Sequence, residues 1–135
     1  MDMKKTFFLF ILAVSLQIAV SLADAKKIEG PGVQVSESIH LKKHISMGIP
    51  VEVWPQAGVA DELKVFARAE EGSVMVIKPS EALSWKGPIK KGEKRKFPLV
   101  LQMNARGKAT VILELTEVVG GQTFTRSLQI KVSAN

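Results

Sequence analysis

The chain of 135 residues contains no cysteine and no tyrosine. Without cysteine it forms no disulfide, although small exported domains often need disulfides because their cores are small. Burial of apolar surface alone must therefore hold the fold together. The same absence excludes a cysteine nucleophile and a lipid anchor attached through an N-terminal cysteine. The lack of tyrosine removes one further candidate proton donor.

Other groups used in catalysis are also scarce. After residue 25 the chain keeps a single aspartate and two histidines. Ser36 or Ser46 could be combined with a histidine and Glu37, but no sharp nucleophile turn marks either serine. No glycine-rich loop follows a strand and opens a helix, as phosphate-binding loops do. The sequence therefore predicts that the protein is not an enzyme and carries no cofactor.

After residue 25 there is no apolar run long enough to span a membrane. At the start of the chain, Lys4 and Lys5 precede an apolar segment of about 17 residues, and Ala23-Asp24-Ala25 offers small residues at a cleavage site. A spanning helix needs roughly 20 residues, so a cleaved signal peptide is favoured over an uncleaved membrane anchor. We expect a signal peptide over 1–25, one domain over 26–135, a periplasmic or secreted location, and no transmembrane segment after cleavage.

Acidic residues are outnumbered, and the formal net charge is +6. Removal of the first 25 residues leaves 17 basic and 11 acidic side chains, and 17 − 11 is still +6. This excess attracts anionic partners. An exported protein rarely meets a genome, so we expect an envelope protein or an anionic surface as partner, and no nucleic acid.

Apolar residues at every second position are abundant, and this is the pattern of half-buried strands. Residues 62–69, for example, place Leu63, Val65 and Ala67 on one face. About seven short strands over roughly 100 residues predict a β-sandwich. The strands are expected as one or two within 32–46, and then at 49–54, 62–69, 73–79, 94–103, 108–117 and 123–132.

Glycines separate these strands. Gly120-Gly121 is the strongest hairpin signal, because tight hairpin turns need positive φ at both central residues. It joins the strand at 108–117 to the strand at 123–132. Turns are also expected at Gly72, Gly92 and Gly107.

Three smaller expectations concern single sites. Residues 79–85 predict a short helix or helical turn that Ser80 would cap. Trp54 is expected in the core at a strand end, since large aromatics dominate small sandwich cores. Arg126 falls on the inward face of the last strand, so it is expected at the rim, where its charged head reaches water.

The stretch "SVMVIKPSEALSWKGPIKKGEKRKFPLVLQMNARGKATVILELTE" resembles immunoglobulin-like domains of exported bacterial proteins. In these domains a strand ends in a proline, a loop and a K-G-E turn follow, and the next two strands are joined by a turn of small residues. The resemblance covers roughly the last 85 residues. It implies an all-β, immunoglobulin-like β-sandwich of about seven antiparallel strands that presents or contacts other molecules. The chain departs from antibody domains, because it lacks paired cysteines and the tyrosine corner.

The segment "SWKGPIKKGEKRKFP", residues 84–98, is densely basic. A turn at Gly92 would bring its two flanks together at one end of the sandwich. One interpretation is a solvated turn whose charges discourage pairing between sheet edges. The other is a binding site for an anionic partner, and an aromatic residue beside lysines favours it. The candidate binding residues are Trp85, Lys86, Lys90, Lys91, Lys94, Arg95 and Lys96.

The segment "HLKKHISM" is an alternative candidate, for metal binding. On a helix His40 and His44 would share one face. On a strand they lie roughly 13 Å apart, too far for both nitrogens to bind one ion. The alternation on both sides favours a strand, although a copper site built from His and Met remains an alternative. Its residues would be His40, His44 and Met47.

These observations predict a non-enzymatic, exported β-sandwich that acts as a binding or scaffolding module of the bacterial cell envelope. One alternative is a small periplasmic metal (copper) binding protein. The other is a surface-fibre subunit completed by a donated strand, for which residues 30–39 are short, alternating and flanked by glycine.

Overall fold

The computed structural model describes residues 30–135, and the predicted signal peptide lies outside these described residues. No helix occurs in residues 30–135, so none there has the length and apolar content needed to cross a membrane. The strands are β2 (Gly32–Gln34), β3 (Ser38–Leu41), β4 (Met47–Trp54), β5 (Ala60–Ala69), β6 (Val74–Lys78), β7 (Leu83–Ile89), β8 (Arg95–Met103), β9 (Gly107–Val119) and β10 (Gln122–Ala134).

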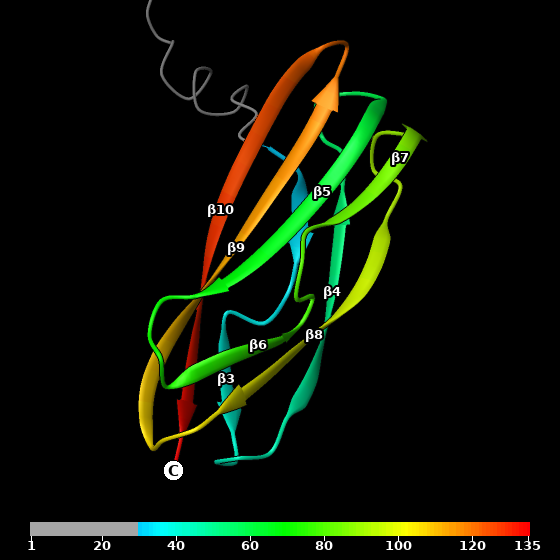
Figure 1. Cartoon of the computed structure of the whole chain (residues 1–135). Helices are drawn as coiled ribbons and strands as arrows, with labels where there is room; N and C mark the ends of the chain where they lie inside the picture. Colours follow the sequence, from blue (N-terminus) through cyan, green and yellow to red (C-terminus); the bar gives the residue numbers. More distant parts are fainter. Residues whose placement is uncertain (1–29) are drawn as a thin grey trace, which may run out of the picture.

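The strands form two sheets that pack face to face (Figure 1). One sheet has five strands in the order β3-β10-β9-β5-β7, and the other has four in the order β2-β4-β8-β6. The predicted all-β sandwich is confirmed. The predicted number of about seven strands is wrong, because the described residues contain nine. The predicted antiparallel pairing is confirmed for every pair of described strands except β3 and β10, which pair in parallel.

The higher strand count has two causes. Within 32–46, where one or two strands were predicted, both β2 and β3 form, and they join different sheets. The helical turn predicted for 79–85 is wrong, since β7 begins at Leu83. In β7, Leu83 and Trp85 are half-buried while Ser84 and Lys86 are exposed, which is the alternation of a strand. The segment 30–39, considered above as a donor strand, contributes β2, which pairs with β4, and the start of β3, which pairs with β10.

The hairpin predicted at Gly120-Gly121 is confirmed. These glycines have φ of 57° and 82°, and they connect β9 to β10, which pair antiparallel with Gln122 opposite Val119. The other glycine turns are not hairpins. Gly72 lies between β5 and β6, Gly92 between β7 and β8, and each turn carries the chain from one sheet to the other.

The core lies between the sheets and consists of the inward residues of each strand. The alternation predicted for β5 is confirmed, because Leu63, Val65 and Ala67 are all buried. Across the core Trp85 of β7 packs on Phe97 of β8, with ring centroids 6.1 Å apart and the planes tilted by 43°. The long central strands contribute the largest share of buried side chains, namely Leu99, Leu101, Met103, Val111, Leu113, Leu115, Ile130 and Val132.

Candidate functional site

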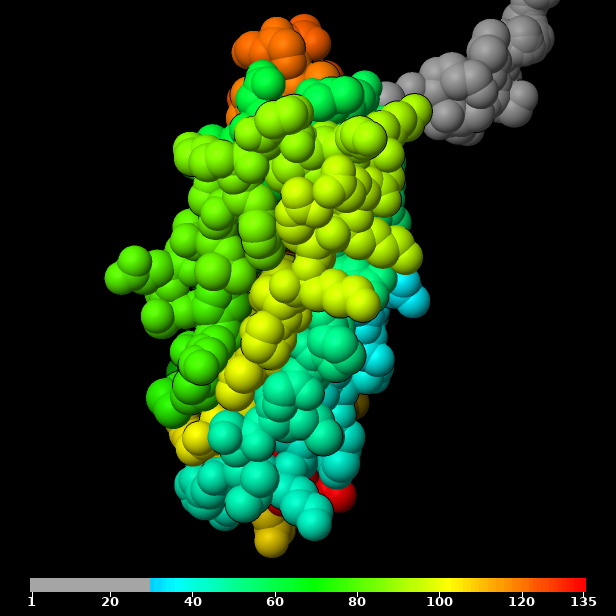
Figure 2. Space-filling view, turned by 90° about the vertical axis from the view of Figure 1, so that its right-hand side faces the viewer, coloured from blue at the N-terminus to red at the C-terminus, as the bar shows by residue number. Residues whose placement is uncertain are grey.

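The basic segment predicted as a binding site connects the two sheets at one end of the sandwich. It leaves β7, turns at residues 90–94 and enters β8, so its flanks lie in different sheets, one on the edge strand β7 and the other on the interior strand β8. We call Lys86, Lys90, Lys91, Lys94, Arg95 and Lys96 the basic end. Figure 2 shows this segment, in yellow-green, over the upper part of the molecule.

The turn within the basic end is held by hydrogen bonds. The Lys90 N–H donates to Glu93 Oε1 at 3.0 Å, and the Glu93 N–H donates to the Lys90 carbonyl at 2.9 Å. The Gly92 N–H donates to the carbonyl of Pro55 at 2.9 Å, which ties the turn to the end of β4. Gly92 has φ of 82°, a conformation that favours glycine. The lysines are therefore displayed from an ordered turn.

Carboxylates neutralise part of this charge. Lys86 Nζ lies 3.0 Å from Glu62 Oε2, and both Lys94 and Lys96 contact Glu52, at 3.3 Å and 3.5 Å. Arg95 contacts Glu93 at 3.1 Å. Six basic groups less Glu52, Glu62 and Glu93 leave a local excess of 6 − 3 = +3.

Lys90 and Lys91 differ from the other members of the basic end. Both are exposed, and within residues 30–135 neither has a carboxylate oxygen within 4.0 Å of its ammonium group. A lysine with a carboxylate partner offers an incoming anion less attraction than a lysine without one. The anion-attracting part of the basic end is therefore concentrated at Lys90 and Lys91.

The two tryptophans have the opposite roles from those the sequence predicted. Trp85 is half-buried and its ring packs against Phe97, so it faces the interior and not the basic surface. Trp54, predicted in the core, is half-buried at the end of β4, and Lys94 Nζ lies 5.4 Å from its ring centroid. This cation–π contact makes Trp54 the aromatic neighbour of the basic end.

A glycine allows Trp54 to lie close to the backbone of β2. A Cβ placed on Gly32 would stand 2.1 Å from Trp54 Nε1 and 2.6 Å from the Gln56 side chain. No side chain fits there unless the indole moves. Gly32 therefore helps to fix the ring on which Lys94 rests.

Hydrogen bonds lower the pKa of two carboxyl groups at the basic end. The Ser84 hydroxyl and then the Lys86 ammonium donate to Glu62 and hold its pKa below the ordinary value of 4.5. The Lys90 N–H and then the Arg95 guanidinium do the same for Glu93. These hydrogen bonds of the folded chain favour the ionised form of both carboxyl groups.

Acid should weaken the fold through these two groups. A carboxyl whose pKa is lower in the folded than in the unfolded chain adds stability above the unfolded value, 4.5, and this stability is lost as the pH falls through the folded value. We expect the Glu62→Gln variant to lose less stability than wild type between pH 6 and about pH 3, measured by urea unfolding. Ser84→Ala, which removes the largest cause, should change the acid dependence in the same direction. An unchanged slope in both variants would contradict this assignment.

A buried acid that sequence analysis did not predict lies near the basic end. Glu117 of β9 is fully buried, and its carboxylate accepts the N–H of Gln56 at 3.0 Å and that of Ala57 at 3.2 Å. Glu117 therefore holds the loop after β4. In this loop the carbonyl of Pro55 accepts the hydrogen bond from the Gly92 N–H. The alternation of the sequence could have predicted the burial of Glu117, since this residue continues the inward series of Leu113 and Leu115.

Arg126, predicted at the rim, is half-buried and donates from Nε to the Pro31 carbonyl at 2.8 Å.

The candidate metal ligands lie at the opposite end of the sandwich. His40 is on β3, and its two ring nitrogens lie 3.1 Å from Ser133 Oγ and 3.4 Å from Asn135 Nδ2. His44 is in the following turn with φ of 66°, and Met47 begins β4. Over residues 30–135 no three His, Asp or Glu side chains gather as a metal site would require. The metal interpretation gains no support from this geometry.

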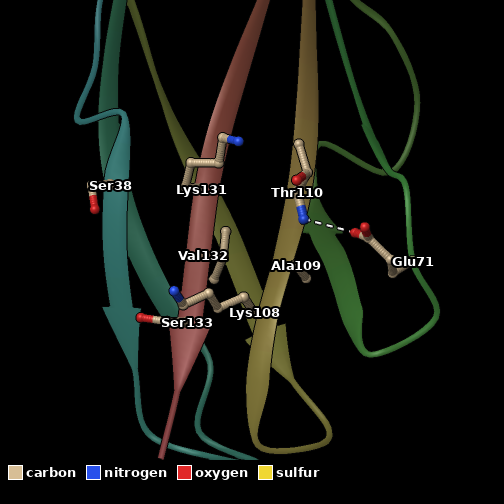
Figure 3. Close-up of a pocket in the computed structure, with 8 residues that line it drawn as sticks. All are labelled: Ser38, Glu71, Lys108, Ala109, Thr110, Lys131, Val132 and Ser133. Atoms are coloured by element: carbon tan, nitrogen blue, oxygen red, sulfur yellow. Dashed lines mark hydrogen bonds between the residues drawn. The ribbon is translucent and has the colours of Figure 1, made fainter.

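A shallow hollow of about 460 Å³ lies on the outer face of the five-stranded sheet (Figure 3). Lys108 and Lys131 line it together with serine and threonine residues, and sequence analysis did not predict it. Glu71 at its rim accepts the Thr110 N–H at 2.7 Å. The carboxylate offsets part of the lysine charge, so this hollow is a weaker anion site than the basic end.

Comparisons with protein-family models and with curated protein sequences give no match. Solved structures with similar backbones include domains 4 and 5 of the S-layer protein SbsC, at a TM-score of 0.49 and 14% identity over 78% of this chain. The chain spans 46% of the length of that S-layer fragment.

Two further similar structures are a cohesin module of a Clostridium perfringens family 33 glycoside hydrolase and the human CEP192 PapD-like domain 7. The cohesin has a TM-score of 0.44 and 10% identity over 78% of this chain and 97% of its own. The PapD-like domain has a TM-score of 0.49 and 10% identity over 89% of this chain and 96% of its own. At these scores and identities the likenesses say nothing of what the chain binds, and the assignment of a β-sandwich rests on its own strands and sheets.

Proposed function

We propose that this chain is an exported, non-enzymatic β-sandwich module that binds or scaffolds a component of the bacterial cell envelope through its basic end. The partner presents anionic groups. The observation that carries the proposal is the display of Lys90 and Lys91, exposed and without a carboxylate partner among residues 30–135, on a turn held by three backbone N–H donors.

An ordered turn favours binding over simple solvation. A solvated charged loop needs no fixed shape, whereas a binding surface loses less conformational entropy on association when its backbone is already ordered. Here the turn is bonded internally and to Pro55, and Pro55 leads into the loop that Glu117 holds. Two layers of contacts thus support the backbone that carries Lys90 and Lys91.

The local charge decides the chemistry of the partner. Of the excess of +3 at the basic end, two charges lie on Lys90 and Lys91, which have no carboxylate partner among residues 30–135, and one on Lys94 and Lys96, which share Glu52. Such a field attracts phosphate, carboxylate or sulfate groups over about one Debye length, ~8 Å at physiological salt. Lysine is a compact cation with three rotatable hydrogen-bond donors, so it can bind anions of varied geometry. This chemistry suits a surface with many anionic groups, such as phospholipid, lipopolysaccharide or an acidic protein.

Charge reversal at the turn tests this function. We expect the double variant Lys90→Glu/Lys91→Glu to lose roughly tenfold or more of wild-type affinity for anionic liposomes, lipopolysaccharide or poly-glutamate at about 50 mM salt. The melting temperature should stay nearly the same, because both side chains are exposed. Binding is measured by co-sedimentation and by retention on the immobilised polyanion.

The chain supplies a matched control. Lys42 and Lys43 are also adjacent and exposed, and they lie in the turn between β3 and β4 at the other end of the sandwich. Lys42→Glu/Lys43→Glu changes the net charge by the same amount, so it should keep most of the binding. Equal losses in both double variants would show that only net charge matters. Wild-type protein that ignores all three anionic probes would overturn the proposal.

A further inference from the structure

The two sheets have four edge strands among the described residues, and three of them are poorly suited to pairing with another chain. β2 has three residues and β3 has four. β7 contains Gly87 and Pro88. Short and proline-containing edges resist the addition of a strand. The remaining edge strand is β6, the outer strand of the four-stranded sheet, whose register with β8 is regular over residues 74–76 and shifts between Val76 and Lys78.

Strand β6 has the composition of a pairing edge. Its sequence, Val-Met-Val-Ile-Lys, has no glycine or proline and is rich in residues with high β-propensity. Val74 and Val76 face the core side, while Met75 is 41% exposed and Ile77 is 37% exposed. An exposed apolar edge strand is the feature that other chains add to most readily.

Two exposed apolar side chains lie on this edge. Of the six large hydrophobic residues exposed in residues 30–135, two, Met75 and Ile77, lie on β6. Leu101 of β8 pairs with Met47 on one side and with Val76 on the other, and because Leu101 is buried, Met47 lies on the core side of the sheet, opposite to Met75. Figure 2 shows the lower part of this sheet, with β6 in green and β4 in teal on either side of β8 in yellow. We call Met75 and Ile77 the β6 patch.

The charges around β6 complement those of a second β6 running in the opposite direction. Glu70 and Glu71 precede the strand, and Lys78 ends it. Antiparallel pairing of two copies brings Lys78 of each copy toward the acidic turn of the other. Pro79 ends the strand, so the chain leaves the edge before Glu81.

The same arrangement keeps the basic ends apart. β6 runs antiparallel to β8, and β8 begins at the basic end and finishes at Met103, beside the β6 patch. A two-fold axis through β6 therefore points the two basic ends in opposite directions. We propose that two copies of this chain associate through β6, antiparallel, so that the two four-stranded sheets continue as one across the interface. This interface is separate from the basic end and does not depend on the function proposed for it.

Sedimentation velocity on the mature chain tests the proposal. Wild type should form a dimer with increasing concentration up to about 0.5 mM. Met75→Glu/Ile77→Glu should weaken the dimer by roughly tenfold or more, because like charges would face each other across the two-fold axis. Val59→Glu/Phe66→Glu is the matched control: these residues are 52% and 37% exposed away from β6, so the dimer should persist. Anionic retention should be kept by the β6 variant, which separates this result from the test of the basic end.

Two measurements keep the test decisive if a variant is destabilised. Hydrogen exchange of wild-type β6 amides should slow as concentration rises, while exchange elsewhere at sheet edges stays constant. Because the chain has no cysteine, Met75→Cys or Ile77→Cys adds a single thiol, and mild oxidation should cross-link the dimer, whereas Val59→Cys should not cross-link. Three results would each overturn the proposal. Wild type could stay monomeric at every concentration, or the dimer could keep its affinity when both β6 residues are substituted. Hydrogen exchange of the β6 amides could also slow only when a different protein is added.

Discussion

Replacing Glu117 with alanine is expected to lower the free energy of unfolding by about 3 kcal/mol. Glu117 is fully buried, and its carboxylate accepts the backbone N–H groups of Gln56 and Ala57. The substitution leaves both donors without this acceptor, and bonds to a charged acceptor contribute about 1.5–3 kcal/mol each. Since a domain of this size has about 5–15 kcal/mol of stability in total, the loss is a large fraction.

Urea unfolding of three variants checks the assignment. Glu117→Gln keeps one acceptor oxygen and removes the buried charge, so we expect a loss of about 1 kcal/mol. Glu114→Ala is the matched control on the same strand: its carboxylate pairs with Arg68 at the surface, at 3.3 Å, and surface pairs contribute about 0–1 kcal/mol. Similar losses from Glu117→Ala and Glu114→Ala would show that the bonds to the loop contribute little.

The sequence predicted which side chains face the core more reliably than which strands lie together. Alternation identified Leu63, Val65 and Ala67 as inward residues, because burial on one face leaves a period of two in the sequence. A period of two carries no information about the partner strand. The turns predicted at Gly72 and Gly92 therefore gave no indication that each leads to the opposite sheet. The Gly120-Gly121 turn was predictable because a two-residue loop between long alternating strands leaves only the adjacent antiparallel pairing.

At the candidate site, too, the sequence predicted some features and not others. Local composition predicted that the lysines lie at one end of the sandwich. Their neutralisation was not predictable, because Glu52 and Glu62 come from β4 and β5, far away in the sequence. The exchange of roles between Trp54 and Trp85 has the same origin, since the contact of Trp85 with Phe97 crosses between sheets. What separates Lys90 and Lys91 from their neighbours is therefore a property of the fold.

Gly87 connects the stability of the five-stranded sheet to the display of the basic end, and replacing it with alanine should be costly. A Cβ at this position would lie 2.1 Å from the carbonyl oxygen of Ala60 and 2.9 Å from the Ile89 nitrogen. Both contacts are with backbone atoms, so no side-chain rotation relieves them. We expect Gly87→Ala to lose about 2–3 kcal/mol of unfolding free energy, at the upper end of the range for overpacking, measured by urea or thermal unfolding.

The physical reason for a large loss is that Ala60 and Ile89 are paired residues of β5 and β7, and both are fully buried. Moving them apart opens the edge of the sheet next to Lys86 and the turn that follows. Gly72→Ala is the matched control, because a Cβ there has no atom within 4 Å, and its effect should stay within about 0.5 kcal/mol. If Gly87→Ala proved as mild as Gly72→Ala, the close approach of β5 and β7 at Ala60 would not be a feature of the folded protein. If it instead lowered both stability and retention on polyanions, the position of β7 would be shown to set the geometry of the basic end.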